Sequence, residues 1–139
     1  MQKFTKFDWL ESFEIGFKAI DDDHRKMLAL MKQVGDAGEA AKFDRCAELP
    51  DELVDFSKAH FEREEVLLDE IRYPAAALHK SYHAGLLVRA DAVKEACKAI
   101  RSAHNFRECC EEMFEFLIDD VVAGDLKIKS YMQESGMIP

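Results

Sequence analysis

Residues 53–71 read LVDFSKAHFEREEVLLDEI, and the spacing within this stretch decides the fold class. Its apolar residues and one histidine–glutamate pair recur every three or four positions, which is the repeat of an amphipathic α-helix. This face comprises Leu53, Phe56, His60, Glu64, Leu67 and Leu68. The stretch predicts one long helix from about Phe43 to Ile71, with Pro50 tolerated near its start.

Similar apolar stripes on either side predict three further helices. They cover about 20–34, ended by Gly35 and Gly38, then 74–101, and then a segment from 102–105 to Gly124. A glycine suits a helix end, and Pro74 suits a helix start. Four long helices with short connections predict an all-α fold, an antiparallel up-down-up-down four-helix bundle.

The chain of 139 residues suits one domain, which we place at 1–139. An irregular N-terminal arm at 1–19 precedes the bundle, which covers about 20–123. Gly124 marks the end or a distortion of the fourth helix, and the tail at 125–139 is expected to add a turn or two.

Composition excludes several classes of protein. Acidic residues outnumber basic ones by 28 to 19, and the net charge of −9 argues against nucleic acid or an anionic membrane as a partner. An apolar fraction of 48% excludes a disordered chain. No apolar run reaches the roughly 18 residues of a membrane span, and the first ten residues lack a signal-peptide core, so we expect a cytoplasmic protein.

The four cysteines show no metal-binding or redox spacing. Cys46, Cys97, Cys109 and Cys110 form no CxxC pair, and the two adjacent ones would strain to bridge each other. We expect reduced, partly buried thiols.

Histidines and carboxylates form a pattern across all four helices. His60 and Glu64 are four residues apart and share a helix face, as do His79 and His83. His60 with Glu64 could alone be an ordinary solvated pair, whereas His79 with His83 is less easily dismissed. An arrangement without function would require five unrelated coincidences. The set is His24, His60, Glu64, His79, His83, Asp120 and Asp125. Nitrogen and oxygen donors without thiolate favour iron, manganese or zinc, and seven donors suit two ions bridged by carboxylates.

Three segments carry a resemblance to a known family. They are Trp9…Gly16…Ile20-Asp21-x-x-His24-x-x-x-Leu28, then His60-Phe61-x-x-Glu64-Glu65, and then Tyr73-Pro74 followed by His79-x-x-x-His83. In this order they resemble the hemerythrins, especially the single-domain bacterial ones. The resemblance covers nearly the whole chain.

The resemblance implies a non-haem di-iron centre with an oxo or hydroxo bridge. His24 and His60 would bind the iron that takes up dioxygen, and His79 and His83 would bind the other. Glu64 and Asp125 would bridge the two. The implied function is dioxygen binding by a carrier for oxygen transport, a store or a sensor.

The fourth helix departs from the family pattern Trp-Leu-x-x-His-Ile-x-x-x-Asp. Phe116 stands in place of the tryptophan, and Asp120 stands in place of the ligand histidine. Asp120 either ligates iron, and is then expected near the iron of His79 and His83, or leaves that iron to water or an anion.

An added carboxylate favours the ferric state of the iron pair. The alternative function is therefore a di-iron oxidoreductase acting on peroxide, nitric oxide or ferrous iron, and the sequence leaves open whether the protein is an enzyme. The expected partner is dioxygen, another small diatomic or peroxide, with an unidentified reductant. We expect a monomer or a weak oligomer.

The spacing of the two aspartates predicts a local irregularity. Residues five apart point about 140° away from each other on a regular helix. A widened π-type turn between Asp120 and Asp125, eased by Gly124, would bring both to one face.

Four apolar residues are expected to wall the ligand pocket, namely Phe61, Phe116, Leu117 and Val121. Glu65 lies about 100° round the helix from Glu64, so we expect it to point elsewhere. We expect His104 to be solvated.

Overall fold

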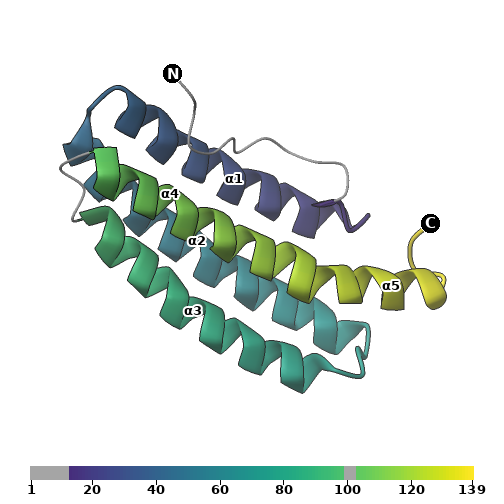
Figure 1. The fold of residues 1–139 in the computed structure, drawn as a ribbon. Helices are drawn as coiled ribbons and strands as arrows, with labels where there is room; N and C mark the ends of the chain where they lie inside the picture. Colours follow the sequence, from purple (N-terminus) through teal and green to yellow (C-terminus); the bar gives the residue numbers. More distant parts are fainter. Residues whose placement is uncertain (1–12, 99–102) are drawn as a thin grey trace.

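The computed structural model describes residues 13–98 and 103–139, without the side chains of a few residues in the second range (Figure 1). Its elements are α1 (Lys18–Glu39), α2 (Phe43–Glu70), α3 (Ala76–Lys98), α4 (Ala103–Ile118), the π-helical segment η2 (Asp119–Asp125) and α5 (Leu126–Glu134). The chain runs up and down through α1 to α4, and η2 and α5 continue α4 in nearly the same direction (Figure 1). The prediction of an all-α bundle is confirmed.

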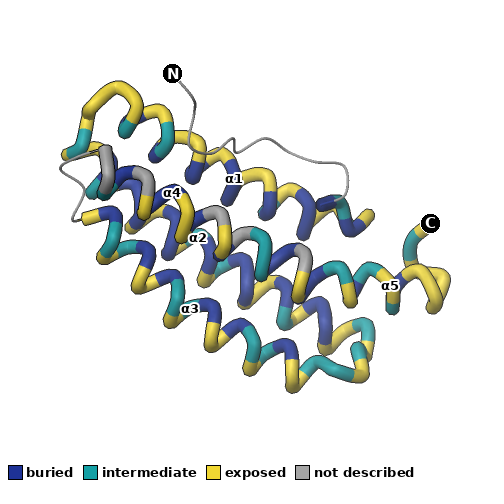
Figure 2. Tube along the Cα trace, in the orientation of Figure 1, coloured by how far each residue is buried: buried dark blue, intermediate teal, exposed yellow. Residues whose placement is uncertain are grey.

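Buried residues lie along the helix faces that meet inside the bundle (Figure 2). Most belong to one apolar cluster to which all four long helices contribute. A second cluster joins the described arm, α1, α2 and α5 through Ile15, Ile20, Leu67, Leu68, Ile128 and Met132. The tail therefore adds a nine-residue helix, more than the turn or two expected, and α5 buries its own share of the core.

The described part of the arm is fixed to the start of α1. The carboxylate of Asp21 accepts hydrogen bonds from the backbone N–H groups of Ile15 at 2.8 Å and Gly16 at 3.0 Å. Gly16 has a φ of +92°, a conformation that glycine adopts without steric cost. None of the helices in the described ranges combines the length and apolar character of a transmembrane span.

The first helix does not end where the glycines suggested. It continues through Gly35 and Gly38 to Glu39. A Cβ atom at Gly38 would lie 2.1 Å from ring carbons of Phe106 in α4. Gly38 therefore serves the close approach of α4 to α1, and the prediction that it ends the helix was wrong.

The cysteines also depart from expectation. A disulfide joins Cys97 in α3 to Cys109 in α4, so the prediction of reduced thiols was wrong for this pair. Cys46 and Cys110 are buried and take no part in this disulfide. The spacing of twelve residues is not a disulfide signature in sequence. The two cysteines meet because α3 and α4 are antiparallel and face each other.

Candidate metal centre

A cluster of four histidines and three carboxylates lies buried between the helices. α1 contributes one residue, α2 and α3 contribute two each, and η2 contributes two. The members are His24, His60, Glu64, His79, His83, Asp120 and Asp125, and none is more than 6% exposed. The structure thus brings together all seven residues that the sequence singled out.

One ligand group gathers around the histidines of α1 and α2. Single donor atoms of His24, His60, Glu64 and Asp125 all lie within 4.8 Å of one another. The Nε2 atom of His24 is 2.8 Å from Asp125 Oδ2, and that of His60 is 3.4 Å from Glu64 Oε2. These atoms could share one cation.

A second ligand group gathers around the histidines of α3. It comprises Glu64, His79, His83 and Asp125, again within 4.8 Å. Glu64 Oε1 lies 2.7 Å from His79 Nε2 and 3.2 Å from His83 Nε2. Asp125 Oδ1 lies 3.1 Å from His79 Nε2. Glu64 and Asp125 therefore direct one oxygen toward each histidine pair, the arrangement that bridging carboxylates need.

The π-helical segment brings both aspartates into the cluster. η2 spans Asp119–Asp125, so the predicted irregularity between Asp120 and Asp125 is confirmed. Gly124 has a second role that the sequence did not reveal. A Cβ atom there would lie 3.0 Å from Tyr82 Cε2 and 3.4 Å from His79 Cε1, so its absence lets η2 approach α3 closely.

Asp120 lies on the other side of the cluster from where we expected it. Its Oδ2 atom is 3.5 Å from His24 Nε2 and 3.7 Å from His60 Nε2. No contact within 4.0 Å joins it to the ring nitrogens of the described His79 and His83. The prediction that it accompanies those two was therefore wrong. Asp120 precedes Asp125 by one wide turn and faces α1 and α2 instead of α3.

Carboxylates outside the cluster orient two of the histidines. His60 Nδ1 lies 3.0 Å from Asp23 Oδ2, and Arg63 holds the same carboxylate at 2.9 and 3.0 Å. His83 Nδ1 lies 3.1 Å from Glu65 Oε2. Such partners fix the tautomer that directs Nε2 at a metal.

Asp23 could not be recognised from the sequence, and Glu65 lies against the cluster although we expected it to point elsewhere. The backbone direction of Glu65 points away from Glu64, but its long side chain reaches across to His83. Asp23 follows two other acids, so nothing in the sequence distinguished it. Burial would raise the pKa of Asp23, but His60 and Arg63 hold it below its usual value.

The electrostatics of the cluster favour the binding of positive charge. Burial would lower the pKa of His24 and of His79, but nearby carboxylates, Asp125 among them, raise both to about 10. Burial and the charge of Asp125 raise the pKa of Glu64. Burial would also raise the pKa of Asp125, but the histidines around it hold that pKa well below its usual value.

The donor set fits metal ions. Among the described residues, the buried side-chain atoms that lack a hydrogen-bond partner all belong to the cluster: His24 Nδ1, His60 Nε2, Glu64 Oε2, both Asp120 oxygens and Asp125 Oδ1. Buried polar atoms are normally paired, so unpaired carboxylate oxygens facing imidazole nitrogens call for cations. A metal bound to His24 and His79 would take the place of the proton that the raised pKa gives each of them.

Apolar side chains cover the cluster from the bundle interior. Phe61, Phe116 and Val121 are buried, and the Phe61 ring stacks on His83 with 4.2 Å between centroids. The side chain of Leu117, and that of His104, lie outside the described part of the structure. A role for this wall as a ligand pocket stays a prediction.

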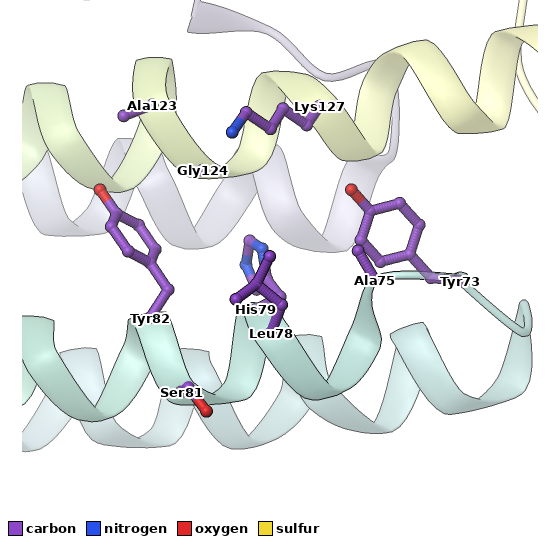
Figure 3. Close-up of a pocket in the computed structure, with 9 residues that line it drawn as sticks. All are labelled: Tyr73, Ala75, Leu78, His79, Ser81, Tyr82, Ala123, Gly124 and Lys127. Carbon is purple, nitrogen blue, oxygen red and sulfur yellow. The ribbon is translucent and has the colours of Figure 1, made fainter.

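A cavity of about 480 Å³ lies on the opposite side of His79 from the bundle core (Figure 3). Its lining includes Tyr73, Leu78, Tyr82, Gly124 and Lys127. It is thus formed by the turn before α3, by α3, η2 and α5, and not by the expected apolar wall.

Fold and site together define a helical-bundle protein with two buried groups of nitrogen and oxygen donors that could each hold a metal ion. A family model described as the hemerythrin HHE cation binding domain matches residues 15–123. The chain belongs to the hemerythrin family.

Several relatives agree with this assignment. A bacteriohemerythrin of Stenotrophomonas maltophilia is 33% identical over 75 residues, which cover 54% of this chain and 49% of the relative. A myohemerythrin of Theromyzon tessulatum is 24% identical over 123 residues, covering 88% and 91%. A hemerythrin-like protein of Naegleria gruberi is 31% identical over 79 residues, covering 57% and 61%. The match spans about half the length of the bacteriohemerythrins of Stenotrophomonas maltophilia and Pseudomonas aeruginosa.

Proposed function

We propose that the protein holds two non-haem iron ions and binds dioxygen at this pair. One observation carries the proposal: Glu64 and Asp125 each offer one oxygen to each histidine pair. His24 and His60 would hold one iron, His79 and His83 the other. Imidazole and carboxylate donors suit iron, and membership of the hemerythrin family supports this metal. When bound, an iron pair supplies the electrons with which dioxygen is held reversibly.

The residues of the chain contribute orientation and exclusion of water. Asp23 and Glu65 hold the rings of His60 and His83 in place. Phe61 and Phe116 are almost fully buried and keep bulk water from the interior side of the cluster. Such a site suits a small diatomic ligand better than a large substrate.

Metal content tests the proposal. The protein is loaded with ferrous iron without air, desalted, and analysed for iron, with an expected value of two per chain. Glu64→Ala removes a bridge and is expected to lose most of the iron. Glu62→Ala, on the exposed face of the same helix, is the matched control and should keep it. Equal iron in both variants would contradict the proposal.

A second candidate function is a di-iron oxidoreductase acting on peroxide, nitric oxide or ferrous iron. Asp120 favours it, because a third buried carboxylate stabilises ferric iron. Absorption spectra of the reduced protein before and after air distinguish the two functions. An adduct band that vacuum removes supports dioxygen binding, whereas direct passage to the ferric spectrum supports redox chemistry.

The remaining sequence-based expectations stay predictions. A monomer or weak oligomer is expected. A cytoplasmic location is also expected, although the Cys97–Cys109 disulfide weighs against a reducing compartment.

A further inference from the structure

We propose that Asp120 completes the metal position of His24 and His60, so that a small external anion binds at the metal of His79 and His83. The inference rests on the proposed di-iron centre. It reverses the assignment that the family resemblance implies, in which the His24–His60 iron takes up the external ligand.

The burial of Asp120 supports its assignment to the metal position of His24 and His60. Its side chain is 1% exposed, and neither carboxylate oxygen has a hydrogen-bond partner. Leaving a buried carboxylate unpaired is costly. The nearest donors are the Nε2 atoms of His24 at 3.5 Å and His60 at 3.7 Å. A cation held by these two nitrogens is the group that would satisfy it.

The two metal positions then differ in their donors. Beside His24 and His60 lie Glu64 Oε2, Asp125 Oδ2 and, outside the compact group of four, Asp120 Oδ2. At the position of His79 and His83, Glu64 and Asp125 are the only other protein donors among the residues that the structure describes. One protein donor fewer leaves room for an external ligand at the second position.

Access from solvent also favours the second position. His79 is 6% exposed, whereas His24 and His60 are fully buried. Its Nε2 atom faces Glu64 and Asp125 inside the cluster. The ring also lines the cavity, where Figure 3 shows Tyr73 and Tyr82 on either side of it and Gly124 and Lys127 opposite.

The cavity attracts anions through Lys127. This exposed lysine and His79 are the basic residues of its lining, which holds no carboxylate. A positive charge at the mouth of a cavity raises the local concentration of small anions, and the effect weakens with salt. The glycine at 124 keeps the wall next to His79 free of a side chain.

Azide is the probe, because its binding to the diferric protein is read from absorption without turnover. At low ionic strength, Lys127→Glu is expected to weaken azide binding on the order of 5-fold, and less at high salt. Lys32→Glu on α1 makes the same charge change on an exposed surface outside the cavity and should have little effect. Equal azide affinity in the two variants would overturn the role of the cavity.

The position of the ligand is tested by a crystal structure of the azide complex, with iron located by anomalous scattering. Azide on the iron of His79 and His83 supports the proposal, and azide on the other iron, or none with both irons present, overturns it. Asp120→Ala should open a second azide site, whereas Asp119→Ala, whose carboxylate pairs with Arg89, should not. Failure to hold two irons would instead refute the di-iron centre itself.

Discussion

Asp23 touches no candidate metal position, yet it orients His60, one of the candidate ligands. Its carboxylate is the partner of His60 Nδ1 at 3.0 Å. Asp23→Asn removes the charge that fixes the ring, so iron should be held about 10- to 100-fold less tightly. Release of iron to a chelator measures this. Asp22→Asn is the matched control, because Asp22 is exposed and pairs only with Lys18 among the described residues; similar release from both variants would show that Asp23 is not a supporting residue.

Single residues also show what could and what could not be predicted from the sequence. The spacing of His60 with Glu64 and of His79 with His83 places each pair on one helix face, so the cluster could be predicted. The side of the cluster on which Asp120 lies could not be predicted, because it depends on the exact rotation of a π turn. Glu65 shows a related limit, since a long side chain can reach a partner that its backbone direction does not indicate.

The helices predicted from apolar stripes agree closely with the observed helices, but the predicted helix ends agree less well. Gly38 lies inside α1 because tertiary packing against Phe106 requires a residue without a side chain there. A sequence read one helix at a time cannot distinguish a glycine that ends a helix from one that admits a neighbour. The π turn of η2 could be predicted because two carboxylates five apart had to reach one site.

The close approach of α1 and α4 yields a prediction about two glycines. Gly38→Ala places a Cβ atom 2.1 Å from the Phe106 ring and should lower the free energy of unfolding by about 1–3 kcal/mol. Gly85→Ala, inside α3 with nothing within 4 Å, should raise it by up to about 1 kcal/mol. Urea denaturation of both variants measures the difference. A stabilised Gly38→Ala variant would show that α4 does not pack this closely.

The whole bundle is expected to depend on metal for part of its stability. All four long helices or their π extension supply candidate ligands, so a metal would bind the folded chain and not the unfolded one. Removing metal should lower the melting temperature by several degrees or more. Calorimetry of the iron-loaded and chelated protein measures this. Identical melting temperatures would mean that the helices do not share a metal site.

The metal-free bundle should also respond to pH in a defined direction. The pKa values of His24 and His79 are raised to about 10 from 6.5, so their contribution is full below pH 6.5 and is lost as pH rises toward 10. Asp125, whose pKa is held well below 3.8, contributes above pH 3.8 and loses this contribution only at lower pH. Melting temperatures of the chelated protein should therefore fall from pH 6.5 to 10. The iron-loaded protein should change less, because metal replaces those protons; a flat profile without metal would refute the charge pairing.

The disulfide between α3 and α4 makes the chain a closed loop between Cys97 and Cys109. A protease that hydrolyses one peptide bond inside this loop divides the backbone but releases no fragment. The nicked protein would migrate as one band on a gel run without reductant and as two bands after thiol treatment. The first fragment would keep α1, α2 and α3 with His24, His60, Glu64, His79 and His83, and the second would keep the chain from Cys109 onward with Asp120 and Asp125. Cleavage there would break the backbone between the candidate metal ligands without removing any of them.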